Sequence, residues 1–278
     1  MPEPITHKYV DVQDEAPDND VLLEATREGV AVVLLNRPGV QNALDARAVD
    51  ALTEAFQTLQ GAEGVRLVLI RGAEGNFCGG ADMAWAAQVA SLPEEDNRLD
   101  ALDLANMLKA LHDIPALTVA LVDGVATGAG AAMVAACDMA VATQGAQFAF
   151  PEVRIGLPAT LLSPYVIEAV GVRNARRLFA TGSWFGADEA LRVGLVDEVV
   201  ADGDALNAAQ DRLATEIMAS APGAMGEIKR VIKAQAEEPI SKHLIEESAR
   251  KLARARSTDE AREGLAAVLA GRKPGWAV

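Results

Sequence analysis

At 278 residues, half of them apolar and 23% charged, the chain is long enough for one large α/β domain and too apolar for disorder. Its 25 basic and 40 acidic residues give a net charge of −15, which argues against broad binding to nucleic acids or anionic membranes, because an acidic surface repels both. Two cysteines supply neither a disulfide framework nor a metal-binding spacing, so we expect a reducing compartment and no metal site.

The N-terminal segment lacks the features of a targeting sequence. Residues 1–20 are acidic and interrupted by prolines, without the basic start and apolar centre of a signal peptide. No apolar run elsewhere reaches membrane-spanning length without a charge or a Gly/Pro break. We therefore expect residues 1–20 to be a loosely ordered lead-in and the protein to be cytoplasmic, without a membrane partner.

The first part of the chain predicts a β-β-α-β order. Arg27-Glu28-Gly29 separates two apolar strands and indicates a hairpin. A helix follows Asp45, because apolar residues then recur at helical spacing, and the next apolar run is typical of a strand buried on both faces. The expected elements are strands at 21–26, 30–35 and 65–70 and a helix beginning near residue 45.

A glycine-dense loop at 72–82 follows the third strand and leads into a helix from Met83. Ligands bind at such loops in α/β folds. The polar interval 91–98 contains a proline, and we expect it to be a mobile flap. An amphipathic helix then ends at Ile114-Pro115.

The second half begins with a strand and becomes largely helical. A strand at 116–122 precedes a turn of small residues at 126–130. Helices are expected at 162–170, 174–180, 187–193 and 207–219, from Pro222, and at the C-terminus behind a capping box of Ser257 and Glu260. The predicted organisation is a lead-in at 1–20, a β/α core at 21–203 and a helical region at 204–278.

Two turns of small residues can present backbone N–H groups to a ligand. They lie at 77–82 and 124–130, each after a strand. Either turn alone is typical of close helix–strand packing, and Gly128-Ala129-Gly130 lacks the dinucleotide-binding spacing. Two such turns after successive strands favour an oxyanion hole made of two amides.

Glu152 is the candidate acid/base. Phe148 and Phe150 precede it, and an apolar setting would raise its pKa towards the range suited to proton transfer at neutral pH. The alternative is a strand-end carboxylate that is solvated or paired with Arg154. Local sequence leaves both interpretations open.

Several motifs occur together in one order: Asn36-Arg37-Pro38 with Asn42-Ala43-Leu44, then 77–82, 123–138, 148–158, 182–200 and Gly271-Arg272-Lys273-Pro274. From about Val21 to the C-terminus, the chain resembles the crotonase (enoyl-CoA hydratase/isomerase) superfamily. The resemblance implies an α/β crotonase-like spiral of ββα units. It also implies C-terminal helices that mediate homotrimers, often paired as dimers of trimers.

The same resemblance implies an acyl-CoA thioester substrate, which carries its own coenzyme A, so no separate cofactor is expected. By position, the amides of Gly79 and Ala129 would hold the thioester carbonyl. The implied substrate- and CoA-binding residues are Arg37, Ala43, Leu44, Gly80, Ala81, Asp82 and Lys273. Of these, Arg37 and Lys273 would contact CoA phosphates, with Lys273 acting across a subunit boundary.

The sequence departs from the family at one catalytic position. Common hydratases carry two glutamates twenty positions apart; one falls on Glu152 and the other on Ala132, which cannot hold water. Residues 152–166 are similar to bacterial methylglutaconyl-CoA-type hydratases, a branch that also has a small residue at the first position. We therefore place hydration of an enoyl-CoA first, including branched or carboxylated ones, double-bond isomerisation second and non-catalytic acyl-CoA binding third.

Overall fold

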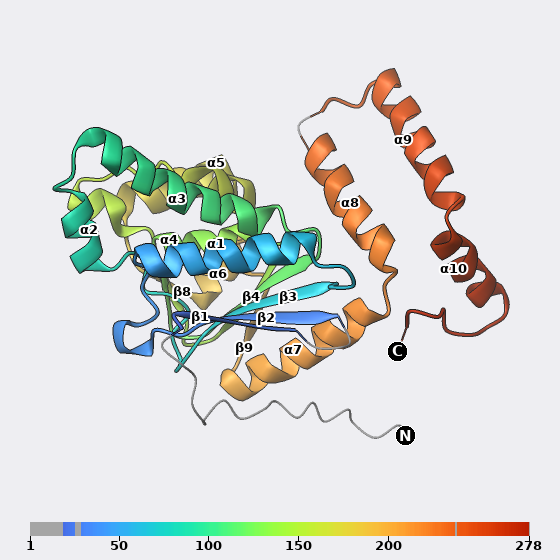
Figure 1. Ribbon diagram of the computed structural model, residues 1–278, viewed down its shortest axis with the longest axis horizontal. Coiled ribbons are helices and arrows are strands. Elements are labelled where there is room, and N and C mark those ends of the chain that lie inside the picture. Colours follow the sequence, from blue (N-terminus) through green and yellow to red (C-terminus); the bar gives the residue numbers. More distant parts are fainter. Residues whose placement is uncertain (1–18, 26–28, 237, 278) are drawn as a thin grey trace.

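A six-stranded sheet forms the body of the molecule (Figure 1). The structure is a computed structural model that describes residues 19–25, 29–236 and 238–277. The sheet has the order β1-β2-β3-β4-β6-β9 and is parallel except for β1. Its strands are β1 (Val21–Ala25), β2 (Val30–Leu35), β3 (Leu67–Gly72), β4 (Leu117–Val122), β6 (Met139–Thr143) and β9 (Glu198–Val200).

A second, smaller sheet collects the short strands that follow the long ones. It contains β5 (Val125–Thr127), β7 (Gln147–Ala149) and β8 (Phe185–Gly186) in the order β5-β7-β8. Parallel bridges from Leu44 to Ala81 and from Cys78 to Ala126 extend the same pairing to earlier loops. The chain therefore repeats one step, in which a strand of the large sheet is followed by a short extended segment and then a helix. This is the ββα spiral predicted from the sequence.

Helices cover both faces of the large sheet. The helices of the body are α1 (Ala46–Gly61), α2 (Met83–Val89), α3 (Glu94–His112), α4 (Ala129–Ala136), α5 (Ser163–Thr181), α6 (Ala187–Val193) and α7 (Gly203–Met218). In Figure 1, α1 and α3 lie side by side over one face, and α7 lies against the other. The strands are apolar on both faces because both faces are buried, as parallel sheets require.

The last three helices stand apart from the sheet at the right of Figure 1. They are α8 (Pro222–Gln235), α9 (Lys242–Arg256) and α10 (Asp259–Leu269), which we call the C-terminal arm. Large apolar residues are exposed on the C-terminal arm, whereas none is exposed on α7. The predicted lead-in at 1–20 lies outside the described residues except for its last two. Among the described residues, no helix is long and apolar enough to cross a membrane.

Two predicted details differ from the structure. The expected flap at 91–98 is wrong, because α3 already begins at Glu94 with three acidic residues in its first turn, where they interact favourably with the helix dipole. By contrast, the two helices expected at 162–170 and 174–180 are present as the two parts of α5, which a kink at Gly171 (φ 74°) separates.

The second difference is the cap of α10. Thr258, not Ser257, accepts a hydrogen bond from Ala261 N at 3.2 Å. Glu260 reaches another helix instead, where its two carboxylate oxygens accept hydrogen bonds from Gly223 N at 2.8 Å and Ala224 N at 3.0 Å. The predicted capping box is wrong because the Glu260 carboxylate accepts hydrogen bonds from the free amides at the start of α8 and not from its own helix.

Candidate active site

Glu152 lies in a 3-10 turn, Pro151–Ile155, between β7 and α5. Its Oε2 atom is buried and has no hydrogen-bond partner among the described residues. Its Oε1 atom lies against Gly128, where an added Cβ would come within 2.7 Å of that oxygen. The carboxylate thus rests at the start of α4, and only a glycine at position 128 leaves room for it.

Arg154 does not neutralise Glu152. Its guanidinium donates to Thr181 O at 3.2 Å and to Ser183 Oγ at 3.1 Å, which holds it on the start of the next loop. Burial raises the pKa of Glu152, and a hydrogen bond from its own backbone offsets part of that rise. A carboxyl group with a raised pKa and a free oxygen can both accept and return a proton near neutral pH.

The first candidate donor is the N–H of Ala129, the first residue of α4. The preceding carbonyl, that of Gly128, accepts from Ala132 N at 2.9 Å inside the helix. Because a trans peptide points its N–H opposite to its C=O, the Ala129 N–H points out of the helix end. No acceptor among the described residues takes this N–H.

The prediction that Gly79 is the second donor does not fit the structure. The Gly79 N–H donates to Gln41 O at 2.8 Å and is therefore engaged. Two residues on, the Gly80 carbonyl accepts from Leu44 N at 2.7 Å, so the Ala81 N–H of the same peptide points away from Leu44. Within the part of the chain that the structure describes, Ala81 N has no acceptor.

The strand register brings Ala81 and Ala129 together. Cys78 N donates to Val125 O at 2.9 Å and Thr127 N donates to Cys78 O at 3.0 Å, in a parallel bridge that pairs Cys78 with Ala126. Ala81 follows Cys78, and Ala129 follows Ala126, by the same three residues, so the two chain segments leave this bridge side by side. A Cβ added to Gly128 would lie 4.0 Å from the Gly80 Cα atom, which agrees with this register.

Other predicted binding residues have structural partners. Asp82 caps α2 by accepting from Ala84 N at 2.9 Å and Trp85 N at 3.2 Å. Arg37 lies between two carboxylates, with Nη2 2.6 Å from Asp45 and Nε 3.4 Å from Asp20.

These ion pairs change the interpretation of Arg37. Its side chain is only 13% exposed, so it holds the loop before α1 rather than facing a CoA phosphate. Ala43 and Leu44 are buried beside it. Lys273 is exposed in the tail beyond α10.

Asn42 joins the two loops that surround the site, a role that its motif did not reveal. Its Nδ2 donates to Ala73 O at 3.0 Å and Asn76 O at 2.7 Å, while its Oδ1 accepts from Arg37 N at 2.9 Å. The side chain is 1% exposed and its φ is 57°, a left-handed conformation that Asn tolerates better than most residues. The sequence alone shows Asn42 only as one of several polar residues in this loop.

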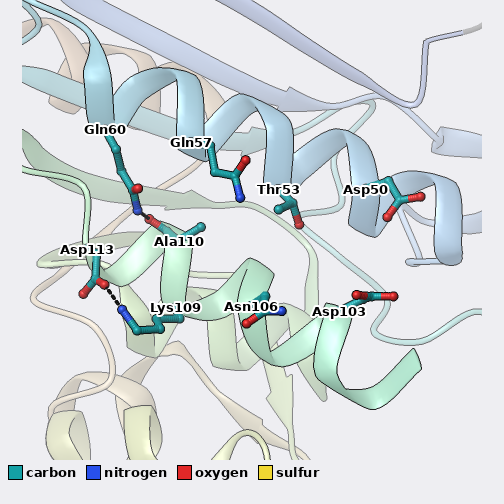
Figure 2. A pocket seen from close by; sticks show the side chains of 9 residues that line it. All are labelled: Asp50, Thr53, Gln57, Gln60, Asp103, Asn106, Lys109, Ala110 and Asp113. Atoms are coloured by element: carbon teal, nitrogen blue, oxygen red, sulfur yellow. Dashed lines mark hydrogen bonds and ion pairs between the residues drawn. The ribbon is translucent and has the colours of Figure 1, made fainter. Parts of the chain in front are cut away.

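A groove lies between α1 and α3, away from Glu152, and Figure 2 shows its lining. This groove has a volume of about 410 Å³ and is lined by Asp50, Thr53, Gln57, Gln60, Asp103, Asn106, Lys109, Ala110 and Asp113. Its one cation, Lys109, is paired with Asp113. The groove is therefore acidic and polar, which suits neither an acyl chain nor the phosphates of an anionic thioester. No group of three or more metal-binding side chains is present among the described residues.

The chain is similar to known proteins over nearly its whole length. The family model described as Enoyl-CoA hydratase/isomerase matches residues 25–278. A putative enoyl-CoA hydratase from Thermus thermophilus is 34% identical over 213 residues, 77% of this chain and 84% of that protein. The short-chain-enoyl-CoA hydratase of Clostridium acetobutylicum is 30% identical over 258 residues, 92% and 96% of the two chains.

Solved structures agree with these relatives. A putative enoyl-CoA hydratase/isomerase (crotonase) from Legionella pneumophila superposes with a TM-score of 0.88 at 33% identity, covering 93% of this chain and 99% of that one. AtuE from Pseudomonas aeruginosa gives a TM-score of 0.89 at 34% identity, covering 93% and 100%. The likeness therefore includes most of the described body and arm.

Proposed function

The chain belongs to the enoyl-CoA hydratase/isomerase family and has its α/β crotonase fold, and from that premise we propose that it adds water to an enoyl-CoA thioester. The observation that carries this proposal is the buried, unpartnered carboxylate oxygen of Glu152 beside the start of α4. Catalysis there uses Glu152 as acid and base and two backbone amides as an oxyanion hole.

The amides act on the thioester carbonyl. The N–H groups of Ala129 and Ala81 donate to its oxygen, on which negative charge develops as the enolate forms. Each such donor, aimed in advance at the developing charge, lowers a barrier by about 3–4 kcal/mol. The start of α4 adds its helix dipole at the same point. Gly79, the donor expected from the sequence, acts on this site only through its neighbours.

Glu152 moves the proton. Its carboxylate takes a proton from water while the water oxygen bonds to the β carbon of the enoyl group, and the π electrons pass to the thioester oxygen. The enolate then collapses, and the acid form of Glu152 returns a proton to the α carbon. Water is consumed and the carboxylate is regenerated. One carboxyl group with a raised pKa is sufficient for both transfers.

Ala132 favours a second candidate, double-bond isomerisation. This residue is fully buried in α4 and offers no carboxylate to hold water. In isomerisation, Glu152 would take a proton from the γ carbon and deliver it to the α carbon, through a dienolate whose oxygen the same two amides hold, and without water. We place hydration first because residues 152–166 are similar to methylglutaconyl-CoA-type hydratases. That similarity is also why we propose a branched or carboxylated acyl group.

We further propose that the wall of the acyl and pantetheine site continues along Gly80, Ala81 and Asp82, and that Lys273 meets a CoA phosphate from a neighbouring subunit. Such a local contact would admit an anionic ligand to a protein of net charge −15. A homotrimer or a dimer of trimers would supply the neighbour. A purely binding role is the least favoured, because it leaves the unpartnered oxygen of Glu152 without a use.

The test is incubation with a panel of enoyl-CoA esters in water enriched in ¹⁸O. Hydration predicts a 3-hydroxyacyl-CoA product that carries the label at the β position. Migration of the double bond without label would replace hydration by isomerisation. Tight binding of the esters with neither product would leave acyl-CoA binding as the function.

A further inference from the structure

Thr127 makes an unusual contact beside the two amides. It is the last residue of β5, is 6% exposed, and its Oγ1 donates to the carbonyl of Gly79 at 2.8 Å. The contact joins the strand before Ala129 to the loop before Ala81. It lies one residue past the last backbone bond of this pairing, from Thr127 N to Cys78 O at 3.0 Å.

Among the described residues, this contact is the one hydrogen bond that holds the peptide between Gly79 and Gly80, although the peptides on either side have partners of their own. A regular parallel ladder would continue with a bond from Gly80 N to Thr127 O, and no such bond exists among the described residues. The loop has two glycines in succession, and Gly80 has a φ of 86°. Glycine pairs interconvert easily between backbone conformations, so the peptide that joins them flips at little cost unless its carbonyl is held.

The Gly79 carbonyl is held by Thr127 alone among the described residues. The next carbonyl, that of Gly80, accepts from Leu44 N, and it shares its peptide with the Ala81 N–H. Rotation of the first peptide would drag the second one out of line, because Gly80 connects them. The Thr127 hydroxyl therefore influences the direction of the Ala81 N–H indirectly, through the peptide between Gly79 and Gly80.

Close packing supports the same role. A Cβ added to Gly80 would lie 2.9 Å from Thr127 O and 3.0 Å from its Oγ1, so the side chain is in direct contact with the turn that it orients. A buried threonine must find an acceptor somewhere. Thr127 donates to the Gly79 carbonyl, which belongs to the peptide directly before the one that carries the Ala81 N–H.

We propose that Thr127 is a positioning residue that aligns the Ala81 amide with the Ala129 amide. This inference rests on the proposed oxyanion-hole chemistry. It predicts that loss of the hydroxyl lowers stabilisation of the enolate while leaving the substrate-binding surfaces in place. The effect therefore falls on kcat and not on ester affinity.

The test compares Thr127→Val, Thr127→Ser and a matched control, Thr143→Val. Thr143, the last residue of β6, is also buried, and its Oγ1 likewise donates one hydrogen bond, to Asp123 Oδ1 at 2.8 Å. With the best ester of the panel, Thr127→Val should lose roughly 10- to 100-fold in kcat with the ester Kd changed less than about threefold. Thr127→Ser should retain most of the activity, and Thr143→Val should keep kcat although it loses stability.

A second readout reports the donor directly. The ¹³C resonance of a thioester carbonyl bound to the wild type should shift downfield as the hole polarises it, and Thr127→Val should lose part of that shift while Thr127→Ser keeps it. If the wild type turns over and polarises the ester but Thr127→Val does both equally well, the positioning role is overturned and the proposed function stands. If the wild type neither turns over nor polarises any bound ester, both are overturned together.

Discussion

The environment of Glu152 penalises its charged form. Burial removes water from the carboxylate, and Oε2 finds no donor to replace that water among the described residues. Since the pKa in the folded protein lies above the ordinary 4.5, the folded chain binds more protons than the unfolded chain between the two values. The free energy of unfolding therefore falls as pH rises through that window, and the full penalty persists above it.

A stability measurement can detect this penalty. Glu152→Gln, which stays neutral, should melt at a higher temperature than the wild type at pH 7, and the difference should shrink as pH falls through the window between the raised pKa and 4.5 and vanish below 4.5. The matched control is Glu263→Gln. There Arg272 and Gly275 N lower the pKa of the carboxyl group to about 2, so the substitution should not stabilise at pH 7. Melting curves of Glu152→Gln that lie at or below the wild type would contradict the assigned burial.

Two features require glycine at position 128: the Glu152 carboxylate lies against it, and its own backbone has a positive φ. Gly128→Ala should lose activity, because the new Cβ would lie 2.7 Å from Glu152 Oε1, and the positive φ adds a cost of about 1–2 kcal/mol. Gly171→Ala isolates the backbone term, since Gly171 has a φ of 74° with nothing near its Cβ position. We expect similar destabilisation in both variants and lost turnover in Gly128→Ala alone. Equal turnover would separate Gly128 from the site.

At this scale the sequence predicted Glu152 and Ala129 but not Ala81. Glu152 could be proposed from its apolar neighbours, and in the structure its side chain is partly buried with Oε2 fully shielded. The choice between Gly79 and Ala81 depends on which peptide is free, and that is decided by Gln41 and Leu44. Both partners lie in a loop more than 30 residues away, so no local pattern could reveal the correct donor.

At the scale of elements, one lysine holds the arm to the body. Lys229 of α8 donates to Ile114 O at 2.7 Å, Ala116 O at 3.1 Å and Asp138 Oδ2 at 2.6 Å, at the start of β4. Its side chain is 23% exposed. Because charged hydrogen bonds that are partly shielded from water contribute more than surface pairs, this contact should set how α8 leaves the core.

Lys229→Met should therefore lower the free energy of unfolding by about 2 kcal/mol. It should also speed hydrogen exchange in α8. Lys233→Met is the comparison, because Lys233 pairs with Asp113 while 57% exposed and should change stability by less than about 1 kcal/mol. Urea unfolding of both variants gives the two values. A loss from Lys229→Met no larger than that from Lys233→Met would show that α8 is held by other contacts.

Helices and strands were predictable where hydrophobic periodicity or turn-forming residues determine them locally. The predictions were wrong where a contact with a residue distant in sequence determines the structure. Asp45 was expected near the cap of α1, and it accepts from Ala48 N at 3.0 Å. The hairpin of β1 and β2 pairs as its sequence indicates. By contrast, Glu260 caps α8 and not its own helix, a tertiary contact with no signal in the residues around it.

At the scale of the molecule, the fold carries the three parts of the proposed site on successive turns of one spiral. The loop after β3 supplies Ala81, the next turn supplies Ala129, and the turn after that supplies Glu152. A sequence shows their order along the chain, and the resemblance supplied the spiral that brings them together. The burial of the Glu152 carboxylate and the register of the short strands depend on tertiary contacts, so the sequence alone could not predict them.

The exposed apolar residues of the arm predict self-association. Ile232 of α8 is 61% exposed and Val268 of α10 is 77% exposed, in a protein whose net charge of −15 would otherwise keep copies apart. Sedimentation should show an assembly of three or six chains, and Ile232→Asp should shift it towards monomers. A wild type that is monomeric at micromolar concentration would remove the arm as an assembly surface.

The central claim is that Glu152 moves the proton while other groups bind the ester. It is tested most directly by measuring kcat and the acyl-CoA Kd of Glu152→Gln with the substrate identified in the panel. We predict that kcat falls by about 10²- to 10⁴-fold, because the amide can neither accept nor return a proton, while Kd stays within about threefold of the wild-type value. Equal turnover in the variant and the wild type would contradict the account.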